Sequence, residues 1–169
     1  DSFKKDKEIV FIAVKQDGNA LQYADDSLKK DKEIVLEAVK NNGSALEYAD
    51  DSLKKDKDVI LEAVKQDGYS LYYIDDSLNK DKEFFLELVK NNGQYLKFAD
   101  KSLKKDKEIV DAAIEQDERA IQYADISFKK DSKITQEIYI KTEPGGRVAF
   151  GKLDKTQEEL FYKNYSKKE

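Results

Sequence analysis

Apolar and polar residues follow one another along most of the chain with a spacing that predicts helices. Ile34, Val35 and Ala38 fall at intervals that place them on one face of an α-helix. Asp31 precedes this face and belongs to the residue types that cap helix N-termini, and Gly43 follows it as a predicted left-handed C-cap. We therefore expect a helix between Asp31 and Gly43.

A shorter apolar pattern follows the glycine. Leu46 and Ala49 share one face and predict a second helix from Ser44 to Ala49, after which Leu53 is expected to point one more apolar side chain inward. A helix this short is not stable alone in water, because few backbone hydrogen bonds offset the cost of starting it. The second helix must therefore pack against its neighbours.

An aspartate recurs every 25 residues, at positions 6, 31, 56, 81, 106 and 131, and five full units fit one template without an insertion. A single unit cannot bury its own apolar face, whereas stacked units bury a continuous core. We predict an all-α solenoid, right- or left-handed, of 25-residue two-helix repeats over residues 1–130. Residues 1–5 match the tail of a unit, so we expect the array to extend further toward the N-terminus.

Residues 131–169 are predicted to form a small non-repeat capping segment. Apolar and polar residues alternate over 137–142 and again from Val148 to Phe150, with Pro-Gly-Gly between them, which predicts a β-hairpin. In the alternative interpretation, the first helix of a sixth unit continues through Ile134 and Ile138. The sequence alone leaves both open for residues 134–150.

The end of the array departs from the template in two further ways. Glu118 replaces the glycine of the earlier units and Asp111 replaces an apolar residue, which is typical of a capping repeat. Asp154 with Gln157 three residues later resembles a capping box and predicts a final helix.

The units resemble a bacterial repeat family catalogued as domain of unknown function 4116. The resemblance rests on DKEIVLEAVKNNGSALEYA from Asp31 to Ala49 and DKEIVFIAVKQDGNALQYA from Asp6 to Ala24, and it covers residues 1 to about 130. It implies a helical fold and a bacterial origin. It implies no activity, substrate or catalytic residue.

The composition excludes much of enzyme chemistry. The chain has no His and no Cys, which removes the commonest general base and the usual zinc and iron–sulfur ligands. Adjacent aspartates such as Asp25–Asp26 and Asp50–Asp51 are interpreted as turn and cap residues, because they repeat along the array instead of facing one another across a cleft. We expect a protein that is not an enzyme and binds no cofactor or metal.

Charge and hydropathy narrow the choice of partners. The net charge is −5, which argues against nucleic acid as a partner of the whole chain. No apolar run is long enough to span a bilayer. The sequence carries no signal that decides between the bacterial cytoplasm and secretion, so the compartment stays open.

Variation between the units supplies the candidate site. One position holds Asn19, Ser44, Tyr69, Gln94 and Arg119, and another holds Gln22, Glu47, Tyr72, Lys97 and Gln122. Polar residues in the other units indicate that both positions face water, so Tyr69 and Tyr72 are predicted to be exposed neighbours, with Tyr95 nearby. Exposed tyrosines are favoured as anchors for partners, although isolated surface aromatics are also common.

Two further ladders follow from the repeat. Lysines recur at the unit boundaries, and Lys54, Lys55 and Lys57 are candidates for attracting an acidic partner. The alternative interpretation is that they form only a mixed-charge, solubilising edge. An aromatic residue also recurs at one position and is expected to pack in the core: Tyr23, Tyr48, Tyr73, Phe98 and Tyr123.

Two functions compete on this evidence. The first is a non-catalytic repeat scaffold that binds a protein or peptide through Tyr69, Tyr72 and Tyr95 and the lysines Lys54, Lys55 and Lys57. The second is a passive spacer or arm of a larger bacterial protein, in which the repeats only set a length.

Overall fold

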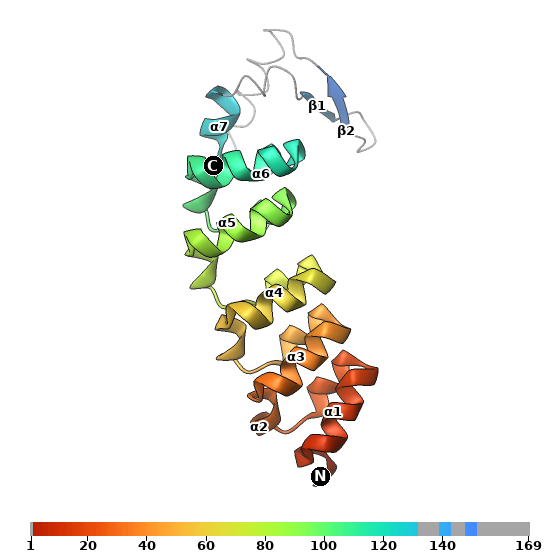
Figure 1. The fold of residues 1–169 in the computed structure, drawn as a ribbon. Helices are drawn as coiled ribbons and strands as arrows, with labels where there is room; N and C mark the ends of the chain where they lie inside the picture. Colours follow the sequence, from red (N-terminus) through yellow and green to blue (C-terminus); the bar gives the residue numbers. More distant parts are fainter. Residues whose placement is uncertain (1, 132–138, 143–147, 152–169) are drawn as a thin grey trace. The chain divides into compact units, whose positions relative to one another are not determined.

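The structure is a computed structural model that describes residues 2–131, 139–142 and 148–151. The chain divides into two compact units, Asp1–Tyr123 and Ala124–Glu169, and each is described by itself. The first compact unit, Asp1–Tyr123, is a stack of helical repeats, which confirms the predicted all-α solenoid (Figure 1).

Each repeat contains one α-helix followed by a 3₁₀-helix. The α-helices are α1 (Lys7–Gln16), α3 (Lys32–Asn41), α4 (Lys57–Gln66), α5 (Lys82–Asn91) and α6 (Lys107–Gln116). The 3₁₀-helices are η2 (Gly18–Tyr23), η3 (Gly43–Tyr48), η5 (Gly68–Tyr72), η7 (Gly93–Phe98) and η9 (Glu118–Tyr123). The second helix is therefore tighter than the predicted α-helix, as is common for such short segments.

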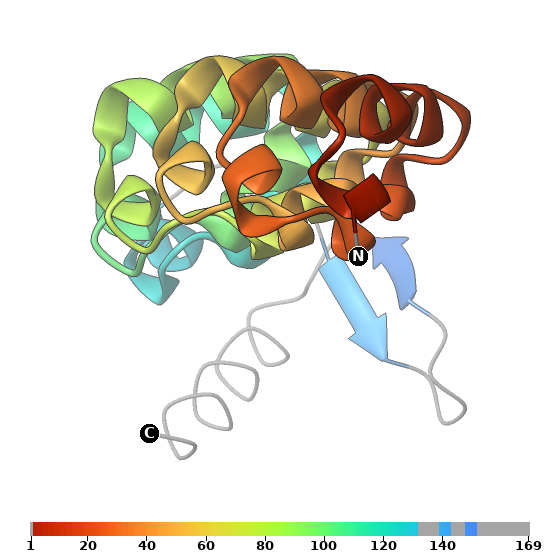
Figure 2. The same cartoon turned by 90° about the horizontal axis from the view of Figure 1, so that it is seen from below.

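A third short helical segment closes each repeat and contains the apolar residue equivalent to Leu53. These segments are η1 (Ser2–Lys5), α2 (Asp26–Lys29), η4 (Leu53–Lys55), η6 (Leu78–Lys80), η8 (Leu103–Lys105) and, in the second compact unit, α7 (Ile126–Asp131). Within residues 2–123, the α-helices lie along one side of the stack and the short helices along the other (Figure 2).

The aspartate that opens each unit caps the α-helix as predicted. The carboxylate of Asp31 accepts hydrogen bonds from the backbone N–H groups of Glu33 and Ile34, at 3.0 and 3.4 Å. These donors have no partner within a helix, so the cap stabilises the first turn. Asn42 ends the same helix in an extended conformation and also caps η3, because its side-chain oxygen accepts from the N–H of Ser44.

The predicted left-handed conformation of the glycines is wrong. None of Gly18, Gly43, Gly68 and Gly93 has a φ in the left-handed region. Each glycine instead begins a 3₁₀-helix, directly after the Asp or Asn that caps it. Glycine is required here by the closeness of the next repeat, since a Cβ on Gly43 would lie 2.3 Å from the carbonyl oxygen of Ala63.

The core runs along the stack. Ile34, Val39 and Leu46 are fully buried and Leu53 nearly so, which confirms the predicted inward face. The aromatic ladder is not part of this core: Tyr23 is 64% exposed, and its four equivalents are half-buried. The reason is local, because the following residue of the repeat, such as Ala24, takes the inward position at the end of the 3₁₀-helix.

The second compact unit contains α7 and an antiparallel strand pair. Strands β1 (Tyr139–Thr142) and β2 (Val148–Gly151) pair with Ile140 opposite Phe150, where the alternating pattern predicts a hairpin. The residues between the strands, the helical alternative around Ile134 and Ile138, and the helix predicted after Asp154 lie outside the described residues.

Candidate functional site

Tyr69 and Tyr72 lie on the surface of η5, as the variation between units predicts. Their side chains are 59% and 68% exposed. A 3₁₀-helix has three residues per turn, so residues three apart lie directly above one another. The two rings are accordingly stacked, with centroids 6.1 Å apart and planes 13° from parallel.

The fourth unit adds three side chains to this pair. The ring of Phe98 meets that of Tyr72 edge-on at 4.8 Å, and Tyr95 lies 6.4 Å from Phe98. The ammonium of Lys97 lies 4.4 Å from the centroid of Tyr69 and 4.5 Å from that of Phe98, which is the geometry of a cation–π contact. We call Tyr69, Tyr72, Tyr95, Lys97 and Phe98 the aromatic cluster.

The aromatic cluster lies where the polar contact between repeats is missing. At the other junctions the residue equivalent to Tyr69 bonds to the cap residue of the next unit: Asn19 with Asn42 at 3.1 Å, Ser44 with Asp67 at 2.8 Å and Gln94 with Asp117 at 2.8 Å. Among the described residues, no hydrogen bond joins Tyr69 to Asn92. A ring–cation cluster therefore replaces a hydrogen bond at this junction.

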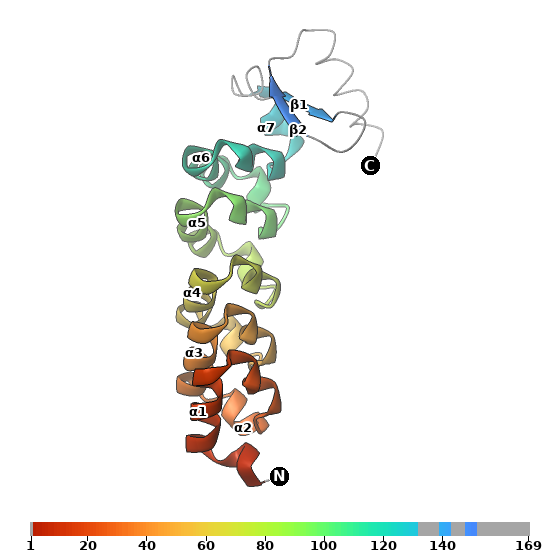
Figure 3. The same cartoon turned by 90° about the vertical axis from the view of Figure 1, so that its right-hand side faces the viewer.

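The same junction is wider than the others. α1 packs directly on α3, α3 on α4 and α5 on α6, whereas α4 and α5 are set further apart (Figures 1 and 3). Larger side chains fill the space: Leu88 replaces the alanine of the other units, and the buried pair Phe84 and Phe85 replaces Ile, Val or their equivalents. Tyr95 also replaces a small residue, and its ring covers Gly68.

Two surface hollows border the aromatic cluster. The first has a volume of about 230 Å³ and is lined by Asp67, Gly68, Tyr69, Asn92, Gln94, Tyr95, Lys97 and Phe98. The second has a volume of about 600 Å³ and is lined by Leu71, Tyr72, Asp76, Asn79, Lys97, Phe98 and Tyr123. Lys97 and Phe98 line both hollows.

The lysines predicted for the site are engaged in ion pairs within the array. Lys54 lies 3.6 Å from Asp51, Lys55 3.5 Å from Asp75 and Lys57 2.7 Å from Asp81. Within residues 2–123, no side-chain hydrogen bond, ion pair or cation–π contact joins these three lysines to the aromatic cluster. The cation that the structure places beside the tyrosines is Lys97.

The pairs of Lys55 and Lys57 belong to two ladders that repeat along the stack. In one, the ammonium of Lys7, Lys32, Lys57 or Lys82 lies 2.7–2.9 Å from the capping aspartate of the next unit. In the other, Lys5, Lys30 or Lys55 lies 3.5–3.8 Å from the first aspartate of the adjacent pair. The lysine and aspartate repeats of the sequence therefore join neighbouring units to one another.

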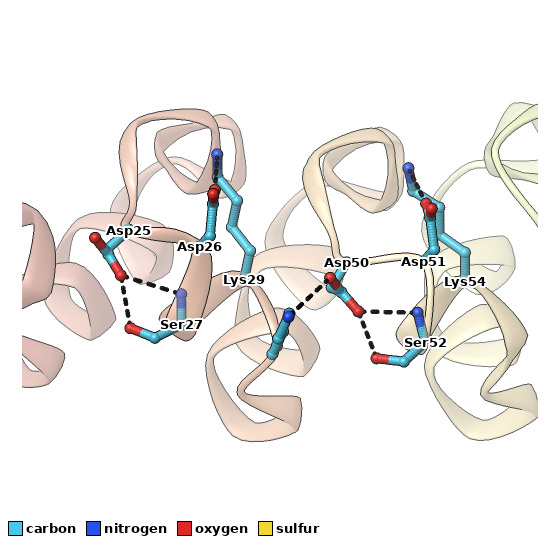
Figure 4. Close-up of polar contacts among 9 residues, drawn as sticks. Asp25, Asp26, Ser27, Lys29, Asp50, Asp51, Ser52 and Lys54 are labelled. Atoms are coloured by element: carbon cyan, nitrogen blue, oxygen red, sulfur yellow. Dashed lines mark hydrogen bonds and ion pairs between the residues drawn. The ribbon is translucent and has the colours of Figure 1, made fainter.

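The paired aspartates have separate structural roles (Figure 4). Asp50 accepts from the N–H and hydroxyl of Ser52, at 3.0 and 2.7 Å, and these hydrogen bonds hold the pKa of its carboxyl below the usual value. Asp51 pairs with Lys54. This arrangement agrees with the interpretation of these residues as turn and cap groups. Among the described residues, no group of three or more acidic, His or Cys side chains is placed to hold a metal ion.

Comparison with known proteins agrees with the repeat geometry. A family model described as "Domain of unknown function (DUF4116)" matches residues 1–29, 31–79 and 81–134. The chain belongs to the DUF4116 family. No curated protein and no solved structure matches it. Of the helices in the described part of the chain, none combines the length and the apolar character needed to cross a bilayer.

The sequence of the DUF4116 repeats predicts the two exposed tyrosines and Tyr95 nearby, but it does not predict that Lys97 and Phe98 contact them. Lys97 is the only cation among the five residues at its position, which was the available signal. Phe98 was assigned to the core because its position is aromatic in every unit, yet it is half-buried and contacts Tyr72. The contacts of Lys97 with Tyr69 and of Phe98 with Tyr72 depend on how consecutive repeats face each other, which the composition does not reveal.

Proposed function

We propose that this DUF4116 array is a non-catalytic scaffold that binds a protein or peptide through the aromatic cluster. The observation that carries the proposal is the stacked pair Tyr69 and Tyr72, more than half exposed at positions where the other units have polar or charged residues. An exposed pair of large aromatic side chains contributes little to the core, so packing does not explain it.

The energetics of the cluster suit an anchor for a partner. Fully covering a large apolar side chain gains roughly 1.5–3 kcal/mol, and tyrosine adds a hydroxyl that can form a hydrogen bond at the rim. The rings are already held by stacking and by the ammonium of Lys97, so binding costs little side-chain entropy. Interaction hot spots are enriched in tyrosine for these reasons.

The non-catalytic part of the proposal rests on the residues available. The sequence contains no His or Cys, and the adjacent aspartates are used as caps and ion-pair partners of the repeat. The aspartates that cap the α-helices and the first aspartate of each adjacent pair thus have structural roles that repeat along the array.

The test compares two variants for capture of a partner. Tyr69→Ser/Tyr72→Gln introduces residues that other units have at these positions, so folding should be unchanged. Tyr23→Gln removes a tyrosine of similar exposure, 64%, in the first unit and serves as the control. A partner recovered with the unaltered array from a lysate of the source cell should bind the double variant at least about fivefold more weakly and the control variant equally well.

A second candidate function, a passive spacer, is favoured by the ion-pair ladders. They join each unit to the next in the same way, with Lys7, Lys32, Lys57 and Lys82 repeating one geometry. Equal binding by the double variant and the unaltered array would support the spacer and contradict the scaffold.

A further inference from the structure

A lysine–aspartate contact recurs at the short helical segment that closes each of the first two repeats. The ammonium of Lys29 lies 3.5 Å from Asp26, and that of Lys54 lies 3.6 Å from Asp51 (Figure 4). Both lysine side chains are largely covered, with 23% and 22% exposed, so their aliphatic stems pack against the array. The repeat therefore has a built position for an alkylammonium group.

The third unit has the aspartate of this ion pair but not the lysine. Asp76 is equivalent to Asp26 and Asp51, but Asn79 stands where they have Lys29 and Lys54. Within the described residues, Asp76 forms no ion pair. The side-chain oxygen of Asn79 is the one buried polar side-chain atom there without a hydrogen-bond partner. Its amide nitrogen lies 3.4 Å from Asp76, a long contact for a hydrogen bond.

The space of the missing lysine is part of the larger hollow beside the aromatic cluster. Between the first two units, the corresponding hollow is lined by Asp26, Lys29 and Tyr48 among others and has a volume of about 320 Å³. At the third unit, Asp76, Asn79 and Phe98 take these positions, and the volume is about 600 Å³. The hollow at the third unit is also lined by Tyr72 and Tyr123. It therefore has more aromatic and fewer charged side chains in its lining than the hollow between the first two units.

The charges around this hollow leave Asp76 available to a cation. Lys97 is the cation that lines the hollow, and its ammonium lies over the rings of Tyr69 and Phe98. In the fourth unit, Lys101 stands at the position of Asp76, so Lys104 has no aspartate at the equivalent place. The ammonium of Lys104 instead donates to the carbonyl oxygen of Lys97 at 2.7 Å. A lysine at this position therefore takes another acceptor when its aspartate is missing.

We infer that the hollow at the third unit binds a lysine side chain of the partner, which takes the place that the array's own lysine takes in the first and second units. The ammonium pairs with Asp76, the stem packs between Tyr72, Phe98 and Tyr123, and rotation of the Asn79 amide turns its unpaired oxygen to the new donor. This inference rests on the proposed function, and it names the side chain that reaches beyond the tyrosine pair.

The probe for this site is Nα-acetyl-lysine methylamide, titrated into the isotope-labelled full chain and followed by NMR. Nα-acetyl-norleucine methylamide, which has a similar stem without the charge, is the matched control. The lysine probe should give saturable shifts at Tyr72, Asp76, Asn79 and Phe98, and the norleucine probe should bind at least fivefold more weakly. Shifts of equal size at Asp26, Asp51 and Asp76 would overturn the inference, because they would reflect only attraction to a negatively charged chain.

Two variants make the test specific to the missing lysine. Asn79→Lys fills the position from within the chain, so it should abolish the localised shifts while the fold is kept. Lys54→Asn empties the equivalent position in the second unit, so it should create a second set of saturable shifts around Asp51. Unchanged probe binding by Asn79→Lys would overturn the inference. Neither variant alters Tyr69 or Tyr72, so loss of this site and loss of the proposed scaffold function are distinguishable.

Discussion

Gly43 lies against the backbone of the following repeat, so close that a Cβ on it would be 2.3 Å from the carbonyl oxygen of Ala63. Gly18 and Gly93 have the same relationship to Ala38 and Ala113, at 2.3 and 2.2 Å. Glu118, which takes the place of the glycine in the fifth unit, is exposed and still begins a 3₁₀-helix. The glycine is therefore needed for contact between repeats and not for the local backbone.

Gly43→Ala should destabilise the array strongly, because the added methyl group meets main-chain atoms that cannot move without shifting α4. We expect a loss of about 2–3 kcal/mol in the free energy of unfolding, measured by urea denaturation. Gly68→Ala is the matched control, since its Cβ would meet the ring of Tyr95 at 2.5 Å instead of backbone. Gly68→Ala should lower the free energy of unfolding by less than Gly43→Ala does. In a Tyr95→Ala background, the loss caused by Gly68→Ala should be smaller still. Equal losses for the two glycines would contradict this account.

The capping aspartates predict a loss of stability in acid. The ammonium of Lys7 lowers the pKa of Asp31, and the hydroxyl of Ser52 lowers that of Asp50. A carboxyl with a lowered pKa in the folded state contributes stability above its unfolded pKa, about 4, and that stability is lost as the pH falls through the folded value. The melting temperature, followed by circular dichroism, should therefore fall steadily below about pH 4. A constant melting temperature down to pH 2.5 would show that these contacts do not stabilise the folded state.

Asp117 offers a test of one such contact by itself. The guanidinium of Arg119 lies 2.9 Å from its carboxylate and, with help from Gln94, lowers the pKa of Asp117 to about 2. Arg119→Gln should raise this pKa toward the ordinary value of 3.8. The midpoint can be followed through the carboxyl carbon by NMR. Lys90→Gln, on the preceding α5, is the control variant and should leave the midpoint unchanged.

The repeat made most of the fold predictable from sequence. An aspartate every 25 residues with apolar residues at fixed offsets, such as Ile34 and Leu46, specifies the helices, their caps and their buried faces. The conformation of Gly43 was not predictable in this way, because it depends on the backbone of the next repeat and not on the local sequence.

The candidate site was predictable in part for a related reason. Comparing units within one chain indicates which positions face water, and this identified Tyr69 and Tyr72. The contact of Lys97 with the ring of Tyr69 arises across a junction, between η7 and η5, and no periodic pattern specifies it. The ion pairs that Lys55 and Lys57 form with the next repeat were missed for the same reason.

We expect side-chain size to set the spacing of α4 and α5. Leu88 and Tyr95 replace residues that are small in the other units, and both occupy the wider junction. If these side chains hold the helices apart, Leu88→Ala/Tyr95→Ala should let α5 approach α4 toward the 8–10 Å that is usual for packed helices. Leu88→Ala alone should instead lower the free energy of unfolding by about 2–4 kcal/mol. Phe84, Phe85 and Tyr95 would keep the junction open, so the substitution would leave a cavity.

Electron–electron distance measurements can check this spacing, since the chain has no Cys and accepts spin labels at chosen sites. Glu62→Cys with Glu87→Cys reports on α4 and α5, and Glu37→Cys with Glu62→Cys reports on the regular pair α3 and α4 as the control. The first distance should exceed the second by several ångströms in the unaltered array and should shorten in the Leu88→Ala/Tyr95→Ala background, while the control distance stays the same. Two equal distances in the unaltered array would mean that the larger residues are accommodated without widening the junction.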